Sequence, residues 1–185
     1  MSGLRVEQLS LPSRRDQDRL GVRASHRGAI VALADGAGGM AHGERAAELA
    51  IARVLEGPMD EATILALDRD VMRVGGETTL ICVTLTSRAN ATIDVRGVAV
   101  GDSRAWARCR GVWMELTEGQ DRRRLGSGEV RPLAFALRAT DRVLLVSDGM
   151  LDLVEEDVLL TLDSLAELVA RVPRDDASAI LIRRI

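Results

Sequence analysis

Apolar runs of strand length recur along most of the chain, separated by short polar or glycine-containing links. They cover residues 4–11, 18–25, 28–35, 78–85, 92–100, 103–109, 112–116, 141–148 and 177–185. Two of the later runs flank Arg110-Gly111, a pair typical of a hairpin turn. Most of the links are too short to hold a crossover helix, so the strands are expected to pair largely in antiparallel fashion.

Apolar residues at helical spacing occur in three other stretches. Residues 42–56 stop before Gly57-Pro58, and residues 60–73 begin at Asp60. A third helical stretch is expected over residues 155–172, broken near Asp163-Ser164. Strands, a helix pair, more strands, then helices and a last strand predict the α+β class, with helices packed on antiparallel sheet.

The length of 185 residues is expected to form a single domain, residues 1–185, with a real core. No stretch reaches the roughly 18 consecutive apolar residues that a membrane span needs. The first residues lack the apolar segment of a signal peptide, so a cytoplasmic location without a membrane partner is expected. Cys82 and Cys109 lie in apolar runs and are expected to be buried free thiols.

The charged residues exclude several classes of protein. All 25 basic residues are arginines, which rules out a P-loop lysine, a Schiff-base lysine and the ATP-binding lysine of kinases. A net charge of −3, with one Phe and no Tyr, gives no basis for binding nucleic acid. Two histidines cannot form a histidine-rich zinc site. The 28 carboxylates remain as candidate functional groups.

Aspartates mark the ends of five predicted strands. They are Asp16, Asp18, Asp35, Asp102, Asp148, Asp175 and Asp176. If these strand ends converge, they form a cluster of short carboxylates, which suits Mg²⁺ or Mn²⁺ and not Zn²⁺. Two divalent ions would neutralise the like charges, and a water shared between them would become a nucleophile for attack on phosphorus. The small residues after Asp35 would also let the Gly36 carbonyl bind metal.

Six motifs stand in a characteristic order: RRDQD, ADGAGGMAHGE, GGETT, VGDSRAW, LLVSDGMLD and RDDASAILI. Together they resemble the metal-dependent serine/threonine phosphatases of the protein phosphatase 2C type, especially bacterial members, over residues 10–185. The resemblance implies two antiparallel β-sheets packed as a sandwich and flanked by α-helices, a four-layer αββα fold. It implies an enzyme of signal transduction that hydrolyses phosphoserine or phosphothreonine through a hydroxide bridging two Mn²⁺ or Mg²⁺ ions. The expected partners of this monomer are a phosphorylated protein substrate and a serine/threonine kinase or its targets.

The resemblance also implies roles for single residues. Asp35 would bridge the two ions. Asp148 and Asp175 would complete the shell of one ion, and Asp18 that of the other. Asp102 would line the site and help to hold a loosely bound third ion. The implied metal ligands are Asp18, Asp35, Gly36, Asp148, Asp175 and Asp102, and the implied catalytic set is Asp35, Asp18, Asp148 and Asp175.

The chain departs from the family pattern at three points. The usual phosphate-binding arginine would fall at Ser13, so Arg14 or Arg15 is expected to bind phosphate instead. The place of a candidate general-acid histidine is taken by Ala37. A long insertion with a mobile flap is replaced by the link of residues 121–130. Its three consecutive arginines are expected to lie in a solvated loop, with a phosphopeptide cradle as the alternative.

These departures keep a second hypothesis open, a catalytically weak or inactive module of the same fold that binds a phosphoprotein or kinase partner. For Asp18 and Asp102, a structural role as turn former or helix cap also remains open. A glycine-rich dinucleotide-binding domain built on the sequence DGAGG is not supported, because no βαβ unit is recognisable.

Overall fold

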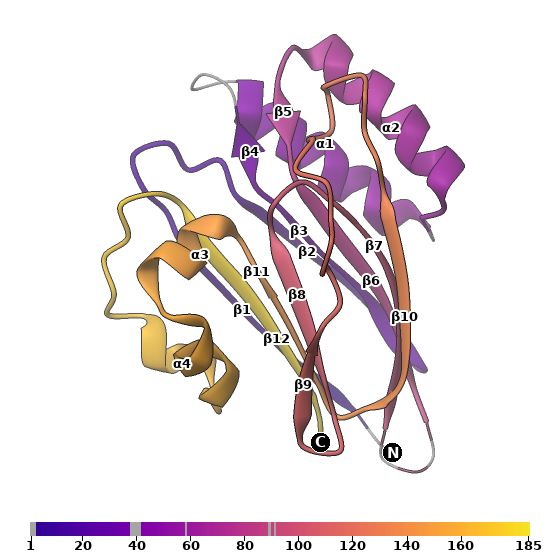
Figure 1. The fold of residues 1–185 in the computed structure, drawn as a ribbon, viewed down its shortest axis with the longest axis vertical. Helices are drawn as coiled ribbons and strands as arrows, with labels where there is room; N and C mark the ends of the chain where they lie inside the picture. Colours follow the sequence, from indigo (N-terminus) through magenta and orange to yellow (C-terminus); the bar gives the residue numbers. More distant parts are fainter. Residues whose placement is uncertain (1–2, 38–41, 58, 89, 91) are drawn as a thin grey trace.

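Two five-stranded sheets form the framework of the structure (Figure 1). The computed structural model describes residues 3–37, 42–57, 59–88, 90 and 92–185. The first sheet has the order β1 (Leu4–Leu11), β12 (Ala177–Arg184), β11 (Arg142–Val146), β8 (Arg104–Cys109) and β9 (Val112–Glu115). The second has the order β10 (Leu133–Thr140), β7 (Ile93–Val100), β6 (Leu80–Ser87), β3 (Gly28–Ala34) and β2 (Arg19–Ser25). Neighbouring strands in both sheets pair antiparallel, as the short links predict.

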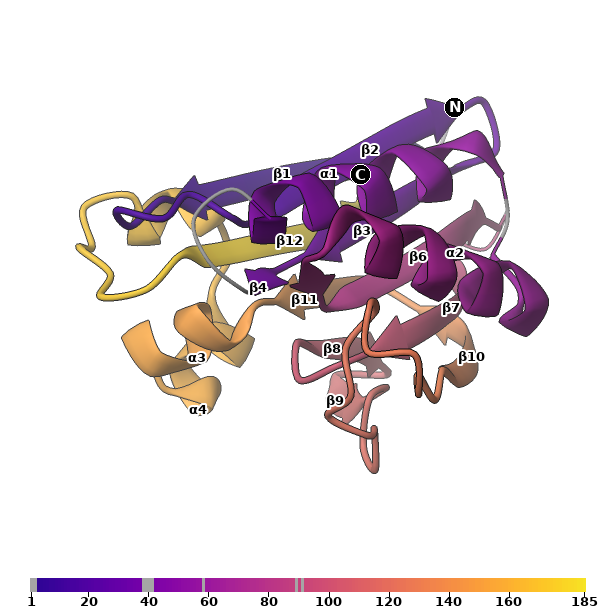
Figure 2. The ribbon, with the colours of Figure 1, turned by 90° about the horizontal axis from the view of Figure 1, so that it is seen from above.

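Helices cover the outer face of each sheet (Figures 1 and 2). The second sheet carries α1 (His42–Glu56) and α2 (Glu61–Val74). The first carries α3 (Asp148–Leu153), α4 (Glu156–Thr161) and the 3₁₀ turn η1 (Leu165–Leu168). A small ladder of β4 (Gly36–Ala37) and β5 (Glu77–Thr78) lies beside α1. The predicted four-layer αββα sandwich is therefore confirmed. No helix in the described part of the chain is long and apolar enough to cross a membrane.

Strand β3 is buried on both of its faces. Its alternate side chains enter different cores: Ala29, Val31 and Leu33 the core between the sheets, and Ile30, Ala32 and Ala34 the core beneath α1 and α2. A strand buried on both faces has no polar side to present, which explains the uninterrupted apolar run. This strand ends directly before Asp35, so a rigid, doubly buried element positions that carboxylate.

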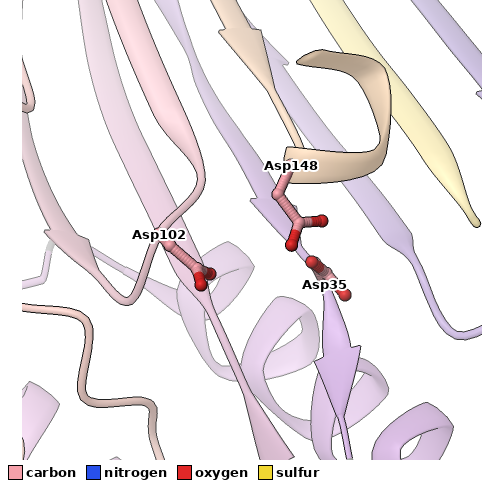
Figure 3. Close-up of side chains that lie close together, drawn as sticks. All are labelled: Asp35, Asp102 and Asp148. Atoms are coloured by element: carbon pink, nitrogen blue, oxygen red, sulfur yellow. The ribbon is translucent and has the colours of Figure 1, made fainter. Parts of the chain in front are cut away.

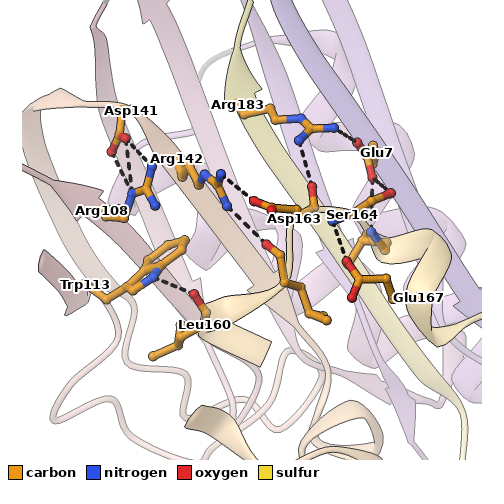
Figure 4. A network of polar contacts seen from close by, with 12 residues as sticks. Glu7, Arg108, Trp113, Asp141, Arg142, Leu160, Asp163, Ser164, Glu167 and Arg183 are labelled. Atoms are coloured by element: carbon orange, nitrogen blue, oxygen red, sulfur yellow. Dashed lines mark hydrogen bonds and ion pairs between the residues drawn. The ribbon is translucent and has the colours of Figure 1, made fainter. Parts of the chain in front are cut away.

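A row of arginines crosses the outer face of the first sheet (Figure 4). Arg108, Arg142 and Arg183 stand in register on β8, β11 and β12. Like charges placed directly opposite each other destabilise a sheet, and here each arginine has an acidic partner. The pairs are Arg108 with Asp141, Arg142 with Asp163 and Arg183 with Glu7. Glu7 also accepts hydrogen bonds from Ser164 and Leu165, which attaches η1 to the sheet.

Three elements differ from the sequence-based expectation. Residues 133–140 form the edge strand β10, whose alternation of half-buried and exposed side chains gives only a weak apolar signal. The stretch expected to be helical over residues 155–172 is shorter and divided. It comprises α4 and η1, and the predicted break lies where Ser164 and Glu167 form a capping box. The short helix α3, which begins at Asp148, was also not predicted.

The two cysteines are free thiols, as expected. Cys82 is buried, whereas Cys109 is only partly buried.

The double-sided burial of β3 predicts a large effect of truncating Leu33, which is fully buried between the sheets. Leu33→Ala should lower the free energy of unfolding by about 2–5 kcal/mol, because it removes buried methyl groups and leaves a cavity. Urea denaturation measures this change. Val172→Ala is the matched control, because Val172 is 87% exposed and should change stability by less than about 0.5 kcal/mol. Equally small effects of the two substitutions would contradict this packing.

Candidate metal centre

Three carboxylates from the two sheets converge at one edge of the sandwich (Figure 3). Asp35 follows β3, Asp102 follows β7, and Asp148 follows β11 as the first residue of α3. Each offers a carboxylate oxygen, and the three oxygens lie within 4.8 Å of one another. Figure 3 shows the carboxylates of Asp35 and Asp148 facing each other, with Asp102 beside them. The convergence of strand ends that the sequence predicts is thus observed for these three residues.

Asp35 is held through its backbone, which leaves its carboxylate available. Its N–H donates to Thr79 Oγ1 at 3.0 Å, and its carbonyl accepts from the Thr79 N–H at 2.8 Å. The Thr78 hydroxyl donates to the same carbonyl at 2.9 Å. Thr79 Oγ1 also lies 2.7 Å from the Ser103 Oγ, one residue after Asp102. The two threonines of the GGETT motif therefore connect the loops that carry Asp35 and Asp102.

Two glycines are required by close packing around the cluster. A Cβ on Gly36 would lie 2.3 Å from the Gly43 carbonyl oxygen, so β4 can approach α1 only without a side chain at that position. Gly101 has a φ of 95°, a left-handed conformation that favours glycine. A Cβ there would also lie 2.8 Å from the side chain of Thr79. Packing therefore explains Gly36 and Gly101, while residues 38 and 39 lie outside the described residues. The Gly36 carbonyl as a metal ligand stays a prediction.

Asp148 is positioned by the preceding residue, Ser147. The Ser147 N–H donates to the Ser178 carbonyl at 3.0 Å, and its hydroxyl accepts from the Ser178 N–H at 2.9 Å. These bonds continue the pairing of β11 with β12 beyond the last paired residues and fix the start of α3. The side chain of Asp148 is not used in this anchoring and remains directed at the cluster.

Asp18 is buried beside this cluster, and its negative charge is only weakly compensated. Only 4% of the residue is exposed, and neither carboxylate oxygen accepts a hydrogen bond from the described residues. Burial, together with the charges of Asp176 and Asp148, raises its pKa to about 7, although the nearby Ser178 and Ser147 hydroxyls partly oppose this. Burial and the charges of Asp18 and Asp148 raise the pKa of Asp35 further, to about 9. The cluster therefore resists full ionisation in the absence of a cation.

The donor set fits hard divalent ions. It consists of carboxylate oxygens, two of them buried and unpartnered, and includes no imidazole or thiolate among the residues brought together in the described structure. Oxygen-only sites of this kind suit Mg²⁺ and Mn²⁺. The raised pKa values of Asp18 and Asp35 indicate that the cluster lacks positive charge. A divalent ion would supply this charge.

The last two predicted strand-end aspartates have different surroundings. Asp175 is exposed and lies outside the three-carboxylate group, and its Oδ1 accepts the Asp176 N–H at 2.9 Å. Asp176 is buried and accepts backbone N–H bonds from Ser13, Asp16 and Gln17 at 2.5, 3.2 and 2.6 Å. Although burial opposes its charge, these bonds hold the pKa of Asp176 below its usual range. Asp176 thus organises the loop between β1 and β2, while metal binding by Asp175 stays a prediction.

The arginines near the cluster differ from expectation in one respect, the position of Arg124. Arg14 and Arg15 are exposed on the loop between β1 and β2, and phosphate binding by either stays a prediction. Arg122 and Arg123 are exposed, as expected for a solvated loop. Arg124 is not: its side chain is 26% exposed, and its Nη2 lies 3.3 Å from both carboxylate oxygens of Asp102. Which of three consecutive arginines turns inward depends on the backbone of the link, and no sequence signal distinguishes them.

Comparisons with known proteins bear on the fold. No protein-family model and no curated protein sequence matches the chain. Among solved structures, a bacterial serine phosphatase variant aligns with a TM-score of 0.80 and 19% identity, covering 99% of both chains. The catalytic domain of the serine/threonine phosphatase PstP, in complex with two manganese ions, aligns at 0.75 and 23% identity over 100% of both chains. RsbX, in complex with magnesium, aligns at 0.75 and 15% identity over 100% of this chain and 96% of its own.

These likenesses cover the whole chain at low sequence identity and therefore define its fold. The chain has the fold of the bacterial serine/threonine phosphatases of the protein phosphatase 2C type, as its six motifs suggest.

Metal binding should stabilise the protein, because ions that bind only the folded state shift the unfolding equilibrium. At 100 times the dissociation constant, Mn²⁺ would add about 2.7 kcal/mol to the free energy of unfolding. Thermal melts with and without Mn²⁺ measure the gain. Asp35→Asn should lose most of it, whereas Asp152→Asn, an exposed position in α3, should retain it. An equal gain in wild type and Asp35→Asn would argue against a central role of Asp35.

The raised pKa values also predict a pH dependence of the metal-free protein. Because the folded-state pKa values of Asp18 and Asp35 are about 7 and about 9, above the usual 3.8, the folded state holds more protons than the unfolded chain. Stability from these groups should therefore fall as pH rises from about 4 to about 9. Urea denaturation in chelator measures the slope. Asp35→Asn should flatten its alkaline part, and an unchanged slope in this variant would refute the assignment.

Proposed function

We propose that this chain is a metal-dependent phosphatase that hydrolyses phosphoserine or phosphothreonine in proteins with two Mn²⁺ or Mg²⁺ ions. The observation that carries the proposal is the convergence of Asp35, Asp102 and Asp148 beside the buried, unpartnered Asp18. The shared fold with phosphatases, one of them in complex with two manganese ions, supports it. Under this proposal Asp35, Asp148 and Asp18 are ligands, Asp175 and the Gly36 carbonyl complete the set of the two ions, and Asp102 lines the site.

The residues of the chain have two tasks in this reaction. They hold carboxylates in fixed positions through Thr79 and Ser147, so that little reorganisation is needed when substrate binds. They also concentrate negative charge at one point, so that Asp35 and Asp18 release their protons only as this charge becomes compensated. When bound, divalent ions of this kind acidify a water molecule and withdraw charge from a phosphoryl group.

The proposed setting is the cytoplasm, where a monomer would act in signal transduction on a phosphorylated protein such as a serine/threonine kinase or one of its targets. The alternative is a catalytically weak or inactive module that binds such a partner. The presence of Ser13, where the family usually has a phosphate-binding arginine, and the short link in place of the flap favour this alternative. The aspartates favour the enzyme, because a binding module has no need of a buried carboxylate without partners.

Hydrolysis of an aryl phosphate distinguishes the two. An aryl oxide leaves without a general acid, so Ala37 should not prevent turnover. Purified protein with Mn²⁺ should show turnover that chelator abolishes and that rises toward alkaline pH. Asp148→Ala should reduce the rate to background, whereas Asp152→Ala, one turn further along α3 and exposed, should remain close to wild type.

Phosphoserine and phosphothreonine peptides, compared with a phosphotyrosine peptide, would then test the substrate class. Folded, metal-loaded protein without turnover above the Asp148→Ala background would refute the enzyme and leave the binding module.

A further inference from the structure

Arg124 holds a particular position among the arginines of the chain. In the described structure it is the one arginine whose side chain forms an ion pair with a carboxylate of the Asp35–Asp102–Asp148 group. Its charge partly opposes the rise in the pKa of Asp35. Although burial acts in the other direction, the charges of Asp102, Asp35 and Asp148 raise the pKa of Arg124. A fixed cation thus stands at the edge of the carboxylate cluster.

The link that carries Arg124 is firmly anchored. Leu125 is fully buried in the core beneath α1 and α2, and its backbone exchanges hydrogen bonds with Thr78 at 2.9 and 3.1 Å. The Gly126 N–H donates to the buried carboxylate of Asp68 on α2 at 2.7 Å. Because these contacts involve the residues directly after Arg124, the position from which its side chain enters the site is set before any ligand binds.

The guanidinium of Arg124 has donors to spare. Its Nη2 contacts Asp102, while its Nε is buried and has no hydrogen-bond partner among the described residues. Burying an unpaired donor is unfavourable unless a ligand can satisfy it. An arginine presents its donors as a planar fork that matches the oxygens of a phosphoryl group. Asp102 uses only Nη2, so the donors of Nη1, which have no hydrogen-bond partner among the described residues, can receive an anion.

We propose that Arg124 binds the phosphoryl group of the substrate and that Asp102 orients its guanidinium. This proposal rests on the proposed phosphatase function and names a residue for a task that the sequence assigns to Arg14 or Arg15. Those two side chains are exposed on the loop between β1 and β2, whereas Arg124 already lies against the cluster. The link that stands in place of a flap would therefore supply the anion-binding group.

Binding of inorganic phosphate to the Mg²⁺-loaded protein, measured by calorimetry, tests this assignment without requiring turnover. Arg124→Gln should weaken phosphate binding roughly tenfold to a hundredfold, the range expected for lost hydrogen bonds to a charged group. Its KM for an aryl phosphate should rise in parallel. Arg123→Gln is the matched control, because Arg123 is the preceding residue and pairs with exposed Glu129 at 3.6 Å. A loss of affinity in Arg14→Gln or Arg15→Gln, with Arg124→Gln unchanged, would assign phosphate binding to the loop between β1 and β2 and overturn the role of Arg124.

Mg²⁺ affinity separates anion binding from a merely structural role. Removing a positive charge beside the cluster should keep or strengthen cation binding while it weakens phosphate binding, whereas a collapsed site would lose both. Arg124→Lys keeps the charge without the fork and should fall between wild type and Arg124→Gln. If Arg124→Gln does not fold, the lysine variant alone decides, and wild-type phosphate affinity in it would refute the proposal.

The outcomes for this proposal and for the phosphatase function can be told apart. Active wild type whose phosphate affinity does not change in Arg124→Gln would overturn the role of Arg124 and leave the phosphatase intact. Inactive wild type that binds phosphate through Arg124 would refute the phosphatase function and leave Arg124 as an anion-binding residue. Wild type that binds no phosphate at all when loaded with Mg²⁺ would also overturn the role of Arg124.

Discussion

The hydroxyl of Thr79 is the contact on which the geometry of the site depends. It accepts the Asp35 N–H and bonds the Ser103 hydroxyl, so one buried side chain connects the loops that carry Asp35 and Asp102. The adjacent Thr78 extends this arrangement, because its backbone pairs with that of Leu125. Leu125 directly follows Arg124, so this pairing also fixes the position of the arginine. Two neighbouring threonines therefore set the relative positions of two carboxylates and one guanidinium.

Asp18 and Asp176 show how the environment assigns opposite tasks to the same residue type. Both are buried, with 4% and 5% of their surface exposed. Asp176 accepts three backbone N–H groups, and these bonds keep its pKa low despite burial, so it can serve as a permanent anion that shapes a loop. Asp18 accepts none, and burial raises its pKa to about 7. A carboxylate in this state is ready to bind a cation.

The sequence predicts the framework well because burial imposes a pattern on it. The doubly buried β3 and the first half of β6, Leu80–Val83, are continuous apolar runs, and α1 and α2 have apolar residues at helical spacing between clear stop signals. Prediction fails where burial is partial. The edge strand β10 alternates weakly, and α3, with six residues, is too short to show helical periodicity. The helical stretch expected near the C-terminus breaks at the predicted place, where Ser164 and Glu167 form a capping box, but it comprises only the short α4 and η1.

The sequence by itself determined the α+β class, the antiparallel pairing and the set of strand-end aspartates, because each depends on local pattern. Only the tertiary structure decided which of these aspartates meet. Asp35, Asp102 and Asp148 converge because β3, β7 and β11 end at the same edge of the sandwich, whereas Asp175 lies outside that group. Likewise, the inward turn of Arg124 depends on contacts of Leu125 and Gly126 with distant residues. Local sequence carries no record of these long-range contacts, so they could not be predicted from it.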